Sequence, residues 1–337
     1  MKFKIFLGII FFIFLSFWFL GQLFFSFGDL KEPLIFVVKP GDNFLKVSTN
    51  LKKAGAIKSS FFFEIYLIFS NQTKILKAGT YQILPEMSII DIVKLLTSGK
   101  TINWRLTIPE GFNIREIENR LKESCLLTFK NIRENCDFDL KSLKIKDFQE
   151  QFSFLQEAPK ESSLEGFLFP DTYELPFDID NVKIAKIMLS NFEKKVFLKF
   201  KSDFQNQKKN FFSIITMASL IEKEVPSFKD KEIVSGILWK RLETKMPLQV
   251  DATINYISGK NKFRISFEET KIDNPYNTYR YLGLPPTPIS NPGLESIRAA
   301  LFPKESPYWF YLSTPAGETI FSKNFKEHLL AKEKYLP

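Results

Sequence analysis

Residues 211–225 read FFSIITMASLIEKEV, and their spacing predicts an amphipathic helix that carries the candidate chemistry. At about 100° per residue, one face of this helix is an apolar stripe formed by Ile214, Ala218, Ile221 and Val225. Glu222 lies on one side of the stripe and Glu224 on the other, with Thr216, Ser219 and Lys223 on the back. Two carboxylates therefore flank an apolar surface that solvated charges normally avoid.

A carboxyl group held against apolar side chains has a raised pKa, because burial disfavours its anion. A carboxylic acid that stays protonated near neutral pH can act as a general acid. The alternative is that both side chains reach solvent, or pair with Lys223 or Lys229. Periodicity does not decide between Glu222 and Glu224, so both remain candidates.

The composition excludes several other classes of protein. A chain of 337 residues with 45% hydrophobic residues predicts about two folded domains. Cys125, Cys136 and His328 do not form a zinc-binding spacing, and neither GxxxxGK[ST] nor GxGxxG occurs. We therefore expect no metal and no cofactor. The net charge of +9 comes from scattered lysines rather than one basic stripe, so we expect no nucleic-acid partner.

The N-terminus predicts a membrane anchor over residues 1–28. Ile5 to Phe27 carry no charge and, as a helix, would span about 34 Å, which is enough to cross a bilayer. A cleaved signal peptide is the alternative, but its apolar region is usually shorter. Lys2 and Lys4 precede the run, which predicts a cytoplasmic N-terminus and an outward-facing remainder. In that oxidising space, a disulfide between the two cysteines and two separate thiols are equally open.

The rest of the chain predicts an α+β protein with a small β-α-α-β-α module at 33–105 and a larger mixed α/β domain at 106–337. In the module, strands are expected at 34–38 and 77–83, and helices at 44–53, 59–69 and 89–96. Residues 126–162 are weakly periodic and are interpreted as a helical insert or connector. The larger domain is expected to contain helices at 113–125, 182–201, 211–225, 231–242 and 294–301, an ordered loop at 271–293, and a hairpin of 308–313 with 319–321.

Several motifs, in order, resemble the endolytic murein transglycosylases of the YceG-like family. They are AGTY at 78–81, IPEG at 108–111, EG at 165–166, PDTY at 170–173, ASLIEKE at 218–224, LQVDAT at 248–253, YNTY at 276–279, GLPPTPI at 283–289 and NPG at 291–293. The apolar N-terminus resembles the family as well. Residues 126–160 and the cysteine pair match nothing we associate with it.

The resemblance implies a LysM-like module at 33–105 followed by a catalytic transglycosylase domain. It implies that the substrate is the glycan strand of bacterial peptidoglycan, cut at the β-1,4 bond between N-acetylmuramic acid and N-acetylglucosamine with a 1,6-anhydro end. It selects Glu222 as the catalytic acid. It also implies a single-pass protein of the cytoplasmic (inner) membrane with a periplasmic catalytic domain, which releases growing strands beside a peptidoglycan synthase.

Residues expected to bind the substrate are Gln249, Asp251, Glu224, Tyr276, Asn277, Tyr279 and Asn291. Alternation places Gln249 and Asp251 on one side of an extended segment, with a turn as the alternative. Asn291 is also expected to shape a turn, and His328 is more often structural. Two other functions remain open. One is a membrane-tethered peptidoglycan-binding protein without activity, and the other is a muramidase that uses water with Glu224 or Asp251 as its second carboxylate.

Overall fold

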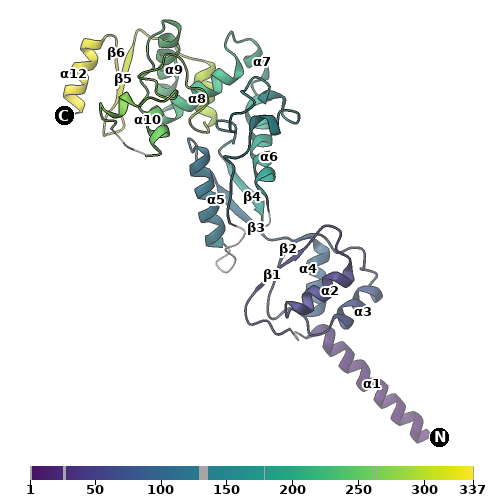
Figure 1. The fold of residues 1–337 in the computed structure, drawn as a ribbon. Helices are drawn as coiled ribbons and strands as arrows, with labels where there is room; N and C mark the ends of the chain where they lie inside the picture. The colour runs from purple at the N-terminus through teal and green to yellow at the C-terminus, as the bar shows by residue number, and fades with distance from the viewer. Residues whose placement is uncertain are drawn as a thin grey trace. The chain divides into compact units, whose positions relative to one another are not determined.

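The computed structural model describes residues 2–25, 28–128, 136–177, 179–260, 262 and 264–336. The chain forms two compact units, one of Met1–Trp104 with Glu174–Ile179 and one of Arg105–Tyr173 with Asp180–Pro337. It passes between the units within β3 (Asn103–Thr107) and β4 (Thr172–Pro176), which form a two-stranded sheet (Figure 1). Both units combine helices with small sheets, so the structure is a mixed α and β fold.

The first unit has the β-α-α-β-α order that the sequence predicts. Its elements are α1 (Lys2–Phe24), β1 (Leu34–Val38), α2 (Phe44–Lys53), α3 (Ser60–Phe69), β2 (Gly79–Ile83) and α4 (Ile89–Ser98). β1 and β2 are antiparallel, with Leu34 opposite Ile83. Polar side chains cap α2 and α4: Asn43 accepts a hydrogen bond from Lys46 N, and Ser88 forms a capping box with Asp91.

The N-terminal transmembrane helix predicted from the sequence is not supported. Across the described ranges, no helix combines the length and the apolar character needed to cross a membrane. The last turns of α1 instead belong to the core of the first unit, where Leu23 is buried. The rings of Trp18 and Phe19 each lie 5.5 Å from the ring of Phe62 on α3, measured between centroids. The prediction rested on the absence of charge over residues 5–27, which does not reveal the contacts that the last turns make with protein.

The second unit contains the longer helices and a C-terminal hairpin. Its helices and strands, besides the ends of β3 and β4, are α5 (Ile114–Thr128), α6 (Asn181–Phe192), α7 (Lys201–Gln205), α8 (Phe211–Glu224), α9 (Phe228–Glu243), α10 (Asp251–Ser258), α11 (Leu294–Leu301), β5 (Phe310–Ser313), β6 (Thr319–Ser322) and α12 (Phe325–Tyr335). β5 and β6 pair antiparallel, which confirms the predicted hairpin. The predicted helix at 182–201 is interrupted by a π-helical segment at Glu193–Phe197.

Part of the predicted helical insert at 126–162 lies outside the described residues, at 129–135. Its described remainder has the end of α5, two 3-10 turns (Ile145–Asp147 and Ser153–Leu155) and irregular chain. Cys125 and Cys136 form a disulfide with their Cα atoms 5.7 Å apart. The pairing that the sequence left open is therefore present, and it joins the end of α5 to the chain beyond it.

α8 lies at the centre of the second unit and packs against α9 and α11. Every residue from Ile214 to Ile221 is buried, including the polar positions Thr216 and Ser219 that were expected on its back. The loop at 271–293 covers this side, since Ser219 Oγ accepts a hydrogen bond from Ile289 N at 3.0 Å. α8 is thus a buried helix whose C-terminal end, at Glu224, reaches a cavity.

Candidate functional site

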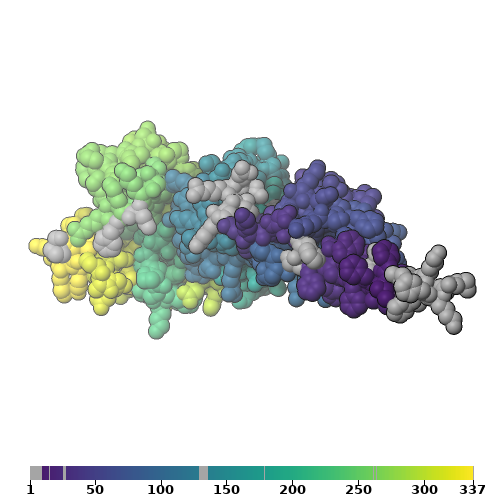
Figure 2. Space-filling view, turned by 90° about the horizontal axis from the view of Figure 1, so that it is seen from below, coloured from purple at the N-terminus to yellow at the C-terminus, as the bar shows by residue number. Residues whose placement is uncertain are grey.

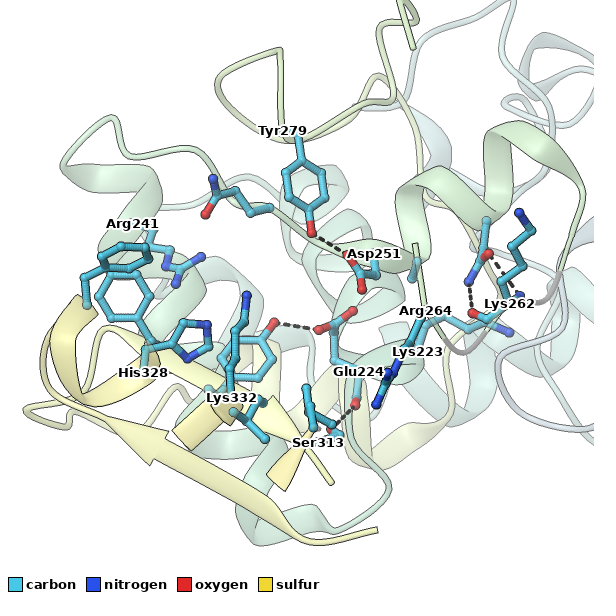
Figure 3. A pocket seen from close by; sticks show the side chains of 18 residues that line it. Lys223, Glu224, Arg241, Asp251, Lys262, Arg264, Tyr279, Ser313, His328 and Lys332 are labelled. Carbon is cyan, nitrogen blue, oxygen red and sulfur yellow. Dashed lines mark hydrogen bonds between the residues drawn. The ribbon is translucent and has the colours of Figure 1, made fainter. Parts of the chain in front are cut away.

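A cavity of about 660 Å³ lies in the second unit, among the end of α8, the start of α10, the β5–β6 hairpin and α12. Glu224 and Asp251 lie near its centre, with Tyr279 above Asp251 (Figure 3). In the space-filling view, the yellow C-terminal residues lie directly beside light-green residues of the chain after α9 (Figure 2). Segments far apart in the sequence therefore form one site.

Glu224 has the properties of a general acid. Its carboxylate accepts a hydrogen bond from the hydroxyl of Tyr311 at 2.8 Å, and its backbone carbonyl accepts one from Ser313 Oγ at 3.3 Å. The pKa of Glu224 is raised to about 7; burial is the largest cause and the negative charge of Asp251 adds to it, while the Tyr311 hydroxyl and the charge of Arg241 oppose the rise. A substantial share of this carboxyl group is therefore protonated at neutral pH.

Asp251 and Gln249 reach the cavity through a turn rather than an extended segment. Gln249 has a φ of 54°, in the left-handed region, and Asp251 is the first residue of α10. The turn is held against the YNTY loop, because Gln249 N donates to Thr278 O at 3.1 Å and Val250 N to Thr278 Oγ1 at 3.0 Å. The hydroxyl of Tyr279, from the same loop, donates a hydrogen bond to Asp251 Oδ1. The expected extended segment is therefore wrong, although Gln249, Asp251 and Tyr279 still line one cavity.

Glu222 is not among the residues that line this cavity. Its Oε1 lies 3.3 Å from Lys231 Nζ on α9, and the two side chains are 8% and 4% exposed. Its Oε2 accepts a hydrogen bond from Gly293 N, just before α11, at 2.8 Å. Two positions along α8 correspond to roughly 200° around the helix, so the two glutamates point in different directions. Glu222 is held in an interior ion pair between α8 and α9 and by a hydrogen bond from the N-cap residue of α11.

Two of the expected substrate-binding residues are fully buried and hold loops together. Asn291 accepts hydrogen bonds from Gly166 N and Leu168 N, both at 2.9 Å, and donates to Phe112 O and Glu165 Oε1. Asn277 donates to the carbonyl oxygens at positions 270 and 272. Both asparagines are 0% exposed, so their side-chain amides serve the loop architecture.

Tyr276 and His328 lie in different places. Tyr276 lines a second cavity of about 340 Å³ together with Glu165, whose pKa burial raises to about 8. Its ring centroid lies 5.2 Å from that of Tyr256. His328 does line the first cavity, with its ring stacked on Phe310 at 5.2 Å. Burial lowers the pKa of His328 to about 4, so the imidazole is neutral at pH 7.

Among the residues of the site that sequence reasoning missed are Tyr311 and Arg241. Tyr311 lies 87 positions after the carboxylate that it contacts. Arg241 is buried in α9 and donates hydrogen bonds to Leu248 O and Trp309 O, which fixes β5 beside the turn that carries Asp251. Neither residue lies in a motif, so only the tertiary structure identifies them. In the described part of the chain, no group of three or more His, Cys, Asp or Glu residues is placed to hold a metal ion.

A partly protonated carboxyl group beside a second carboxylate in an open cavity is an arrangement that suits general acid–base catalysis. The profile of the YceG-like family matches residues 36–334, so the chain belongs to that family. The resemblance drawn from the sequence motifs is thereby confirmed.

Named relatives agree with this membership. An endolytic murein transglycosylase of Bacillus subtilis (strain 168) is 33% identical over 315 residues, which cover 91% of this chain and 86% of that protein. One of Streptococcus pneumoniae (strain R6) is 30% identical, over 88% of this chain and 57% of that protein. A crystal structure of a YceG-like protein from Listeria monocytogenes matches with a TM-score of 0.60 at 31% identity, over 90% of this chain and 100% of that chain.

Proposed function

We propose that this chain is a peptidoglycan lytic transglycosylase that cuts within glycan strands. The names of its relatives support the substrate class, since each is an endolytic murein transglycosylase. The observation that carries the proposal is the carboxyl group of Glu224, which faces the cavity and has a pKa of about 7.

The acid in this proposal is Glu224 rather than Glu222. A catalytic acid must reach the glycosidic oxygen, and Glu224 lines a cavity of about 660 Å³. Glu222 is engaged with a buried ammonium group and a backbone N–H, which leaves it no access from this cavity. The sequence motif contains both residues, and the position of Glu224 at the cavity supports it as the acid.

In the proposed reaction, Glu224 protonates the oxygen between N-acetylmuramic acid and N-acetylglucosamine as the glycosidic bond breaks. The resulting carboxylate then accepts the proton of the muramic C6 hydroxyl while that oxygen bonds to the anomeric carbon, giving a 1,6-anhydro end. No water is consumed, and Glu224 ends in its starting protonation state. The attacking hydroxyl is tethered to the reacting carbon, which lowers the entropic cost of the step. The negative charge of Asp251 would stabilise the developing positive charge at the anomeric carbon.

One observation favours a muramidase as the second candidate. Asp251 supplies a second carboxylate in the same cavity, as a hydrolase requires. In that reaction, water rather than the C6 hydroxyl attacks the anomeric carbon, and the product has a reducing end. The two reactions share Glu224 as the acid and differ only in the nucleophile.

The proposal also covers the role of the first unit, the compartment in which the protein acts and its partner. We infer that residues 33–105 are a LysM-like module that binds glycan, because β1 and β2 pack with α2, α3 and α4 in the order expected of one. The disulfide supports action in an oxidising compartment, where the cell wall lies. Release of growing strands, and a peptidoglycan synthase as partner, follow as proposals from the same family likeness.

Purified glycan strands incubated with the full chain test this proposal. We expect soluble fragments from the unmodified protein and from Glu243→Gln, a control that changes an exposed glutamate at the end of α9. Glu224→Gln should yield none, because the amide cannot donate the proton. Fragments from Glu224→Gln at the rate of the control would overturn the assignment. No fragments from any of the three would favour a binding protein.

A further inference from the structure

Cationic side chains surround the two carboxylates of the cavity. Five of the lining residues are basic, namely Lys223, Arg241, Lys262, Arg264 and Lys332. Figure 3 shows Lys332 on the His328 side of Glu224 and Asp251, and Arg264 with Lys262 on the other side. The rim of the cavity is therefore positively charged on both flanks.

Three of these five cations already have partners. Arg241 donates to backbone carbonyl groups of Leu248 and Trp309. Lys262 pairs with Glu269, with its Nζ 2.5 Å from Oε1. Lys223 Nζ donates to Gly111 O at 3.2 Å. These cations mainly fix the walls of the cavity.

Arg264 and Lys332 differ from the other three. Both are exposed, and neither side chain has a hydrogen bond or an ion pair within the described ranges. The charges that mainly act on the pKa of Glu224 are instead those of Asp251 and Arg241. A cation close to Glu224 would lower its pKa and so reduce the fraction of the carboxyl group that is protonated at neutral pH. Their placement at the rim leaves both available to charges on a ligand.

We propose that Arg264 and Lys332 form a carboxylate-binding rim that recognises the acidic substituents of muramic acid residues. This inference rests on the proposed function. N-acetylglucosamine is neutral, whereas each muramic residue carries either a free lactyl carboxylate or a stem peptide with its own carboxylates. A guanidinium binds a carboxylate in a bidentate manner, and an ammonium binds it as a point charge. The rim would thus select anionic glycan and orient it over Glu224.

Binding of fluorescent glycan oligomers of equal length tests the rim. Three oligomers are compared: peptide-bearing, amidase-stripped with free lactyl groups, and stripped with those groups converted to amides. All binding measurements use the full chain with Glu224→Gln, which prevents turnover. Into it we introduce Arg264→Glu with Lys332→Glu, or the matched control Lys160→Glu with Lys186→Glu at two exposed positions away from the cavity.

We call the double variant Arg264→Glu with Lys332→Glu the rim pair. We expect it to weaken binding of at least one anionic oligomer by about tenfold and to change binding of the neutral oligomer by less than about twofold, because reversal of a surface charge acts only on charged ligands. Loss with the peptide-bearing oligomer alone identifies stem carboxylates, and loss with the stripped oligomer alone identifies the lactyl group. Added salt should weaken binding of the anionic oligomers to the chain with Glu224→Gln alone more than binding to the rim pair. The milder Arg264→Gln with Lys332→Gln should give a smaller loss in the same direction.

Equal weakening of the neutral oligomer, equal weakening by the control pair, or no weakening at all would overturn the rim. The proposed function fails on a different result, namely cleavage by Glu224→Gln. A chain that loses cleavage on Glu224→Gln but binds all three oligomers equally well with the rim pair retains the function and loses only the inference.

Discussion

Replacement of Glu224 by Gln should change the pH dependence of stability as well as the activity. The pKa of this carboxyl group rises from 4.5 to about 7 on folding, because burial disfavours its anion. Between these values the folded state binds more protons than the unfolded state. The stability of the unmodified protein should therefore fall as pH rises through this window, relative to a variant that does not titrate there.

The expected size follows from the shift. One pKa unit corresponds to about 1.4 kcal/mol, so this shift predicts a change of about 3 kcal/mol in the difference between the two unfolding free energies. This value is an upper one, since Glu224 is partly exposed to the cavity. Below the unfolded-state pKa the carboxyl group is protonated in both states, so the buried anion causes no destabilisation. Above about pH 7 the group is ionised in both states, and the destabilisation reaches its full value.

Urea unfolding of both full-length proteins, at pH 4.5 and at pH 8, measures this difference. Tryptophan fluorescence follows unfolding, with Trp239 and Trp309 in the second unit and Trp18 and Trp104 in the first. Cleavage of glycan strands, followed in parallel, should fall below detection in the variant, a loss of at least about 10²-fold, as expected on loss of a general acid. A stability difference that is the same at both pH values, or cleavage within about tenfold of the unmodified protein, would refute the reasoning.

Three further predictions follow from the same contacts. Glu222→Gln removes the anion beside buried Lys231, so unfolding in urea should show a loss of about 3–5 kcal/mol, and a loss below about 1 kcal/mol would contradict the interior ion pair. Asp251→Asn removes a negative charge that raises the pKa of Glu224, so the midpoint of that carboxyl group in a ¹³C NMR titration should move to lower pH; an unchanged or higher midpoint would argue against the coupling. Reduction of the disulfide at the end of α5 should cost about 3 kcal/mol of unfolding free energy, and equal denaturation curves with and without reductant would exclude this contribution.

Local patterns were sufficient to predict much of the fold. The helix expected at 294–301 is α11, and the hairpin around residues 315–317 is present, because periodicity and turn residues act over short distances. The module from β1 to α4 was predicted in its full order for the same reason. The N-terminal prediction was wrong because the absence of charge over residues 5–27 does not reveal that the last turns of α1 contact the core of the first unit.

The site depended on contacts that no local pattern contains. The helix wheel placed both Glu222 and Glu224 beside an apolar stripe, but α8 is buried on nearly all sides. The cavity is completed by Tyr311 from β5, and the ion pair by Lys231 from α9, so tertiary contacts decide which glutamate is accessible. Motif residues also serve architecture, as Asn291 shows by bonding two buried backbone N–H groups.

Mass spectrometry of the fragments released from purified glycan strands tests the central claim most directly. Intramolecular attack by the C6 hydroxyl after protonation by Glu224 predicts 1,6-anhydro ends, one water lighter than reducing ends, and no such fragments from Glu224→Gln. Reducing ends throughout would show that water is the nucleophile, and anhydro ends from Glu224→Gln would show that another group supplies the proton.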